Sequence, residues 1–183
     1  YAGLTDIYSG KVWGGVRSTG LTANLSHDLG GNWGFWSSAD FQLYKGQNVK
    51  DNQRYRLMGG SYYRVISNQE REFTAGVSLL HWSYKFNLSE ETYGHGGYYS
   101  PQNYIGISLP LSYDARWGDD FVYRIKTGIS YSQTKSNAID FFPNDPDLQA
   151  QAFVSQLETG VVPAFKGDTS AGVSYNLEGS FEY

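Results

Sequence analysis

The residues best suited to covalent chemistry in this sequence are His81 and Ser83, which stand two positions apart in the run His-Trp-Ser. Residues two apart on a β-strand point to the same face, so a serine–histidine pair for nucleophilic hydrolysis is geometrically possible. The motif has only two residues, however, and the neighbouring predicted strands offer no carboxylate that would orient the histidine. Glu90 and Glu91 fall in a predicted loop. We therefore expect no enzymatic activity.

The other histidines and the charge balance argue against a metal, a cofactor and nucleic acid. His27 and His95 have no metal-ligand spacing with each other or with carboxylates. The chain contains no cysteine, which excludes a disulfide scaffold and a thiolate metal site. The net charge is −4, and the lysines and arginines are scattered rather than gathered into a basic stripe. We expect no metal ion, no cofactor and no nucleic-acid partner.

Apolar and polar residues alternate with a period of two in seven long stretches, which is the pattern of β-strands with two different faces. These stretches are approximately Val16–Asp28, Phe35–Leu43, Asn52–Val65, Phe73–Leu79, Ile105–Tyr113, Phe121–Tyr131 and Val173–Phe181. We expect strands on the order of 10–14 residues, longer than the roughly 5–6 of globular proteins and sufficient for the roughly 9–11 of a membrane strand. No apolar run is long enough for a membrane helix.

The connections between these stretches alternate between short and long. The short ones are Leu29–Asn32, Ser67–Glu70 and Gly118–Asp120, and the long ones are Gly46–Asp51, Lys85–Asn103 and Lys135–Thr169. In an antiparallel sheet all short links lie at one end, as in outer-membrane barrels with short periplasmic turns and long outer loops. The sequence predicts an all-β, antiparallel up-and-down transmembrane β-barrel, with residues 1–183 forming one domain. Seven strands cannot close a barrel, so we expect part of a larger one.

Aromatic residues support the same orientation of the strands. Trp33, Phe35, Trp117, Phe121, Phe181 and Tyr183 all fall at the periplasmic end on the odd-numbered face. Amphipathic rings prefer the membrane interface, so we interpret this set as one aromatic girdle facing lipid.

The even-numbered face then lines the lumen, where charges meet water rather than lipid. The charged candidates are Asp40, Arg54, Arg56, Arg64, Arg116, Arg124, Lys126 and Glu178, and the aromatic ones are Trp36, Tyr44, Tyr62 and Trp82. An aromatic ring stacks on the apolar face of a pyranose, and conduction requires contacts weak enough to release the cargo. Two interpretations stay open: these residues contact a sugar polymer, or they pair and pack with one another inside the barrel.

Two outer loops carry further candidates. Gly96 and Gly97 tolerate positive φ, and Tyr98 and Tyr99 either fold inward as a gate or cover the barrel rim. In the segment between residues 135 and 169, Asp147 is expected to cap a short helix over Leu148–Leu157.

The run Gly96-Gly97-Tyr98-Tyr99-Ser100-Pro101, followed by Gln102-Asn103-Tyr104 and the strand Ile105–Tyr113, resembles the C-terminal outer-membrane barrel of the BcsC family of bacterial cellulose synthase components. Residues 46–54, 62–65 and 131–136 are similar to the same domain in the same order. The resemblance implies a porin in the bacterial outer membrane that passively exports a polysaccharide, most specifically cellulose, a β-1,4-glucan. It also implies a periplasmic repeat region and an inner-membrane synthase as partners, with outer-membrane lipid around the barrel.

Two alternatives use the same residues differently. An outer-membrane lipid-modifying hydrolase would use His81 and Ser83, an arrangement that resembles lipid A deacylases. A soluble carbohydrate-binding β-sandwich would use the same aromatic residues without a membrane.

Overall fold

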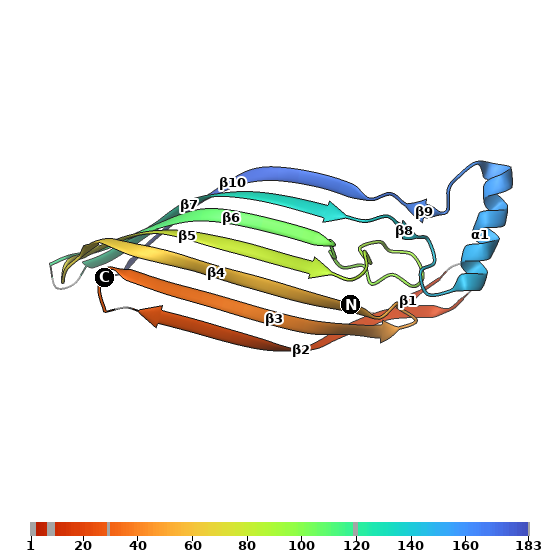
Figure 1. Ribbon diagram of the computed structural model, residues 1–183, viewed down its shortest axis with the longest axis horizontal. Coiled ribbons are helices and arrows are strands. Elements are labelled where there is room, and N and C mark those ends of the chain that lie inside the picture. The colour runs from red at the N-terminus through yellow and green to blue at the C-terminus, as the bar shows by residue number, and fades with distance from the viewer. Residues whose placement is uncertain (1–2, 7–9, 29, 119–120, 183) are drawn as a thin grey trace.

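One large antiparallel sheet dominates the computed structural model, which describes residues 3–6, 10–28, 30–118 and 121–182 (Figure 1). Its long strands within this part of the chain are β2 (Val12–Asp28), β3 (Trp33–Gln47), β4 (Asn52–Ser67), β5 (Arg71–Tyr84), β6 (Asn103–Trp117), β7 (Phe121–Ser136) and β10 (Asp168–Glu182). Each pairs with the next in chain order, and β1 (Leu4–Thr5) extends the edge beside β2. The predicted antiparallel order of the seven long strands is confirmed.

Two features of the sheet were not predicted. The long strands have 14 to 17 residues rather than 10–14, because backbone pairing continues through polar residues such as Thr134–Ser136 after the apolar alternation has ended. A second, two-stranded sheet joins β8 (Ile139–Asp140) to β9 (Ala164–Phe165) within the last long connection.

The two ends of the sheet differ, as Figure 1 shows: short turns lie at one end, and the long loops with helix α1 (Pro146–Thr159) lie at the other. We call these the turn end and the loop end. In the turn between β4 and β5, the Asn68 side-chain oxygen accepts hydrogen bonds from the amides of Glu70 and Arg71 at 3.0 and 2.8 Å. Parts of the other two predicted turns, namely Leu29, Asp119 and Asp120, lie outside the described residues, as does Tyr183.

The two faces of the sheet also differ. Odd-numbered side chains along the long strands are mostly exposed and apolar, and Leu57, Leu79 and Tyr175 expose 53%, 58% and 87% of their surface. Even-numbered neighbours are more often half-buried or buried along β3, β4 and β5. We call the odd side the outer face and the even side the inner face. Within the described residues, no helix is long and apolar enough to cross a membrane.

The sheet has no second sheet of comparable size against either face in the described part of the chain. The predicted alternative of a β-sandwich, which needs two sheets packed face to face, is therefore wrong. The first and last long strands, β2 and β10, are not paired with each other among the described residues, and β10 is exposed along its whole length.

The expected aromatic girdle lies on the outer face at the turn end. Trp33 contacts Tyr63 at a ring-centroid distance of 4.9 Å, and Phe121 stacks on Phe181 at 6.3 Å. Further ring contacts at 6.4 and 6.0 Å link Phe73, Tyr113 and Tyr123 between these pairs. The girdle thus runs across β3, β4, β5, β6, β7 and β10, further than the sequence pattern alone indicated.

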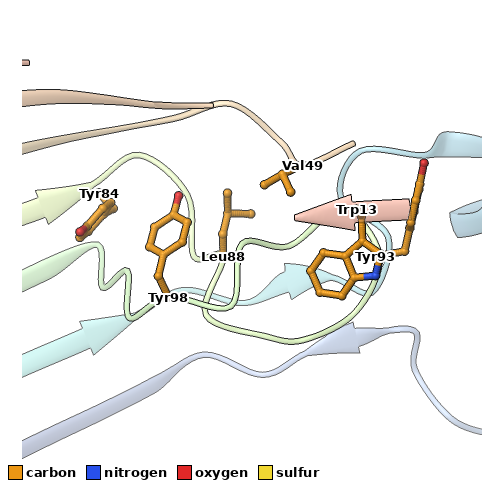
Figure 2. Packing of buried hydrophobic residues seen from close by; sticks show 6 residues of the cluster. All are labelled: Trp13, Val49, Tyr84, Leu88, Tyr93 and Tyr98. Carbon is orange, nitrogen blue, oxygen red and sulfur yellow. The ribbon is translucent and has the colours of Figure 1, made fainter. Parts of the chain in front are cut away.

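The hydrophobic core lies at the loop end rather than behind the sheet. Its buried members are Trp13, Val49, Tyr84, Leu88, Tyr93 and Tyr98, drawn in Figure 2. They come from the start of β2, the β3–β4 connection, the end of β5 and the long β5–β6 loop. Leu88 is fully buried, so this loop is packed onto the end of the sheet.

Helix α1 begins earlier than predicted, and Asp147 is not its cap. Asp145 is the N-cap, and its carboxylate accepts a hydrogen bond from the amide of Leu148 at 3.1 Å. Pro146 follows in the first turn, where its fixed φ favours helix initiation and its missing amide hydrogen costs nothing. A hydrogen bond from Lys11 at 2.7 Å also lowers the pKa of Asp145.

Replacing Asp145 with alanine should destabilise the start of α1 by about 1 kcal/mol, because an amide of the first turn loses its acceptor. Hydrogen exchange at the amide of Leu148 measures the effect. Asp147→Ala is the matched control, since it removes an acid of the same turn without removing the cap. Equal exchange in the two variants would contradict the cap assignment.

Candidate functional site

The structure places every charged and aromatic lumen candidate on the inner face of the sheet. The twelve residues are Trp36, Asp40, Tyr44, Arg54, Arg56, Tyr62, Arg64, Trp82, Arg116, Arg124, Lys126 and Glu178, all at even positions in the strand register. One row across four strands pairs Asp40 with Arg56, Arg56 with Trp82, and Trp82 with Tyr104. The sheet therefore brings side chains that are distant in sequence onto one surface.

Asp40 is the centre of a polar network on this surface. Its carboxylate forms an ion pair with Arg54 and accepts hydrogen bonds from Thr22 at 3.0 Å and Gln42 at 3.2 Å. Asp40 is buried, so the loss of Arg54 would leave a carboxylate without its charged partner. This part of the inner face fits the interpretation of a mutually paired interior.

Other donors on the inner face have no partner. The Nε atoms of Arg54 and Arg56 and the indole Nε1 of Trp82 are buried and make no hydrogen bond within the described part of the molecule. Buried donors of this kind cost free energy unless a ligand or water satisfies them. They lie in neighbouring rows across β4 and β5.

At the turn end the charges pair again. Arg64 donates to Asp28 at 2.5 Å and has Glu72 within 4.0 Å, and Arg124 forms an ion pair with Asp114. Exposed pairs of this kind contribute little to stability.

Trp36 and Tyr62 extend over glycines on the inner face. A Cβ added at Gly60 would lie 2.8 Å from Trp36 Nε1, and one added at Gly34 would lie 2.1 Å from Tyr62 Cζ. Gly60 is the cross-strand partner of Trp36, and Gly34 is that of Tyr62. Each ring therefore covers the space that a side chain would fill, and the Arg64 guanidinium lies over the Tyr62 ring at 5.2 Å from its centroid.

The two rings border a hollow of about 240 Å³ in the inner face. Its polar lining includes Thr74, Ser78, Ser112, Lys126 and Asn176. A surface with aromatic rings and several hydroxyl, amide and ammonium groups can bind a sugar unit by stacking and hydrogen bonding. Among the residues that line the hollow, no side chain is positioned to break a covalent bond of a ligand.

Pro110 explains why the hollow forms at this place. It stands in the middle of β6 and has no amide hydrogen to donate. The register between β5 and β6 runs from Ala75 opposite Leu111 to Ser78 opposite Ser108, with no paired residues between. Pro110, Gly76 and Val77 line the hollow at this interruption.

A second aromatic group lies at the loop end of the inner face. Tyr98, from the β5–β6 loop, stacks on Tyr44 at a centroid distance of 5.1 Å and contacts Tyr84 at 5.8 Å. Asn52 donates a hydrogen bond to the Tyr98 hydroxyl at 3.1 Å. Burial raises the pKa of Tyr98 to about 12, so the ring stays neutral. The loop thus places a tyrosine against the inner face.

The four predicted gating residues have different roles. Gly97 adopts a positive φ of 65°. Gly96 does not appear among the positive-φ glycines, and a Cβ there would lie 2.1 Å from the ring of Tyr98. Tyr98 is buried, whereas Tyr99 is 52% exposed and hydrogen-bonded to Thr134 at 2.6 Å. Gly96 therefore makes room for the inward tyrosine rather than supplying an unusual backbone conformation.

His95 joins the two longest loops. Its side chain is fully buried, with Nε2 3.0 Å from the carbonyl oxygen of Asp140 and the ring against Phe165 at 5.4 Å. Burial lowers the pKa of His95, although the hydrogen bond to Asp140 opposes this shift. Burial thus favours the neutral imidazole, whose Nε2 hydrogen is donated to the carbonyl of Asp140.

His81 and Ser83 share the outer face, but each has another partner. His81 Nε2 lies 3.0 Å from the side-chain oxygen of Asn103, and Ser83 donates to the carbonyl of Gln102 at 2.5 Å. No hydrogen bond joins the two in the described structure, so the geometry gives no activated nucleophile.

The sequence reasoning missed Asn52, Tyr84 and Tyr104, which complete the aromatic groups on the inner face. Tyr84 and Tyr104 share the even numbering of Trp82, so the alternation contained the signal. The role of Asn52 depends on the loop that packs onto it and has no such signal.

Comparison with known sequences identifies relatives along the whole chain. Residues 1–183 match the family described as the C-terminus of cellulose synthase operon protein C. The chain is 34% identical over 192 residues to cellulose synthase operon protein C of Xanthomonas axonopodis pv. citri, an alignment that covers 100% of this chain and 13% of that protein. It is 36% identical over 135 residues to the protein of that name from Escherichia coli K12, covering 74% and 12%.

A third relative, from Komagataeibacter xylinus, is 32% identical over 152 residues, covering 83% of this chain and 12% of that protein. It is also named cellulose synthase operon protein C. The chain thus spans about an eighth of the length of these curated relatives. Their names indicate no catalytic activity.

Acidification should loosen the contact between the β5–β6 loop and the β7–β10 connection. Because the pKa of His95 is lowered in the folded protein, its contribution to stability is complete above the ordinary value of about 6.5 and is lost as the pH falls below it. Hydrogen exchange of residues 88–97, corrected for intrinsic rates, should therefore accelerate as the solution is acidified.

His95→Gln should remove this pH dependence, since glutamine does not titrate. His27→Gln is the matched control, because His27 lies on the outer face of β2 away from both loops. The assignment is wrong if the loop exchanges at the same rate across this pH range in the unmodified protein.

Proposed function

Since the chain belongs to the family of the C-terminal region of cellulose synthase operon protein C, we propose that its sheet is part of an outer-membrane β-barrel that conducts cellulose out of the cell. Residues 1–183 contribute strands to this barrel as one domain. The polymer moves passively along the inner face, and its synthesis at the inner membrane supplies the driving force. Periplasmic repeats and the synthase are the partners.

The aromatic rings over glycines carry this proposal. Trp36 and Tyr62 extend over Gly60 and Gly34 on the inner face, beside a hollow of about 240 Å³. A β-1,4-glucan is a flat, neutral polymer with apolar faces on its pyranose rings and hydroxyls at its edges. Stacking on aromatic rings of the inner face, with serine, threonine and amide groups alongside, matches both features without binding tightly.

The outer face supports placement in lipid. Its exposed leucines, isoleucines and valines form a broad apolar surface, and large surfaces of this kind mark contact with membrane or protein. The aromatic girdle at the turn end borders this surface, as expected at a membrane interface. In a lipid environment the open edges at β2 and β10 need hydrogen-bonding partners, which further strands of a larger barrel would supply.

The β5–β6 loop is the proposed gate. Tyr98 occupies the loop end of the inner face, stacked on Tyr44 and bonded to Asn52. A polymer that follows the inner face outward meets this ring after passing Trp36 and Trp82. The hinge at Gly97 and the space above Gly96 let the loop carry the tyrosine toward or away from the path.

Planar-bilayer conductance of the full-length protein tests the proposed function. Cello-oligosaccharides added on the side of the short turns should reduce the conductance, whereas other oligosaccharides should leave it unchanged. An open pore that is indifferent to all sugars would overturn the assignment of cellulose. The folded protein should also require detergent and show heat-modifiable mobility on gels.

Trp36→Ala should weaken the block by cello-oligosaccharides about fivefold, because one aromatic contact worth about 1 kcal/mol is lost. Trp82→Ala should have a similar effect. Phe35→Ala is the matched control, because Phe35 is adjacent to Trp36 in β3 but lies on the outer face. Normal block and normal export in both tryptophan variants would refute stacking while leaving the barrel intact.

A further inference from the structure

Four cationic side chains lie on the outer face at the loop end of the sheet. They are Arg17 on β2, Lys45 on β3, Lys85 directly after β5, and Lys135 on β7. Arg17 pairs in register with Lys45, and Lys135 with Asn103. The amide of Lys85 donates to the carbonyl of Gln53 at 3.0 Å, which continues the register of β5. All four are exposed, and we call them the cationic belt.

Acidic side chains are segregated from this belt. Within the described long strands, every aspartate and glutamate occupies an inner-face position: Asp28, Asp40, Glu72, Asp114, Asp168, Glu178 and Glu182. Lys45 has Asp51 of the adjacent connection at 3.7 Å, and both are largely exposed. No described carboxylate lies within 4.0 Å of the cationic groups of Arg17, Lys85 or Lys135. The belt therefore presents net positive charge.

The belt runs parallel to the aromatic girdle at the other end of the sheet. Lys45 follows Trp33 by 12 residues on β3. Lys85, directly after β5, follows Phe73 by 12 residues, and Lys135 follows Tyr123 by 12 residues on β7. An even separation keeps each pair on one face, and the equal spacing on three strands gives both rows the same slope across the sheet.

This spacing corresponds to the thickness of a membrane. Twelve residues extend about 40 Å along a strand at roughly 3.3 Å per residue. With a strand tilt of about 40°, the height is about 30 Å, which spans the apolar band of about 25 Å in outer-membrane barrels and reaches the interface beyond it. When the girdle lies at one interface, the belt lies at the head-group level of the other.

The residues just below the belt change in character over a short distance. Along β4, Leu57 is followed on the outer face by Tyr55 and then Gln53 toward the loop end. His81 contacts Tyr55 at a ring-centroid distance of 5.6 Å and lies 3.0 Å from the side-chain oxygen of Asn103. Aliphatic, aromatic, amide and cationic groups thus succeed one another, as at a water–lipid boundary.

We propose that the cationic belt binds the phosphate groups of lipopolysaccharide, the phosphorylated glycolipid of the outer leaflet. The inference rests on the proposed function, because only a membrane-spanning sheet turns this face toward lipid. Arginine and lysine both recognise phosphate, and each cation near an anionic lipid surface contributes attraction. His81, Asn103 and Gln53 then serve as polar groups of the lipid interface, which gives the His-Trp-Ser run a role without catalysis.

Binding of lipid A to the full-length protein in a zwitterionic detergent tests the belt. The probes are lipid A with its phosphates, dephosphorylated lipid A and inorganic phosphate. Each single substitution to glutamine in the belt should weaken binding of phosphorylated lipid A about fivefold, and all four together at least about twentyfold. The other two probes should bind weakly to every variant.

Arg71→Gln is the matched control, because Arg71 is a cation of the same face at the turn end, in register with Ala115. It should change binding by less than about twofold. Lys45, Lys85 and Lys135 replaced together by arginine should retain binding. Heat-modifiable mobility reports whether each variant folds. If the fourfold variant does not fold, the triple arginine variant and the single glutamine variants test the belt in its place.

Three results would overturn the proposal: unchanged binding in the fourfold variant, equal binding of dephosphorylated lipid A, or equally tight binding of inorganic phosphate. Conductance with cello-oligosaccharides, measured on the same preparations, separates the two proposals. Lipid A binding with no sugar block would support the belt and overturn the assignment of cellulose. Sugar block in protein that does not bind lipid A would support the assignment of cellulose and refute the belt.

Discussion

The feature on which the rest of the structure depends is the register of seven long antiparallel strands. Side chains alternate with a period of two, so a slip of one residue would turn each strand's apolar set to the opposite face. The hydrophobic core at the loop end contains few residues, and the sheet has no layer packed behind it among the described residues. Backbone pairing along 14 to 17 residues per strand must therefore maintain the separation between the apolar outer face and the polar inner face.

On the inner face, glycines determine where the aromatic rings can lie. Gly34 and Gly60 leave space for Tyr62 and Trp36, and Gly96 does the same for Tyr98 in the loop. Trp82 contacts Tyr104 in a tilted arrangement instead, with its indole nitrogen unpaired within the described part of the chain. The aromatic rings are therefore not equivalent. Trp36 and Tyr62 extend over glycines, whereas the indole nitrogen of Trp82 is buried beneath the inner face.

The sequence predicted the strands and their faces because alternation is a local property that each strand carries by itself. It did not predict what depends on contacts between distant segments, such as Asn52 beneath Tyr98 or His95 against Asp140. The helix start is an intermediate case. Asp145 and Asp147 are both plausible caps, and the position of Pro146 in the first turn favours Asp145. That signal was present in the sequence and was overlooked.

Pro110 has a mechanical consequence for the sheet. The missing pairs between β5 and β6 leave a short seam in an otherwise continuous ladder. A force that pulls β5 and β6 apart meets the least resistance at this gap, because fewer hydrogen bonds share the load. The sheet can bend at this gap in the β5–β6 pairing while the strand registers on either side stay intact. The β5–β6 ladder is thus most compliant beside the hollow that Trp36 and Tyr62 border.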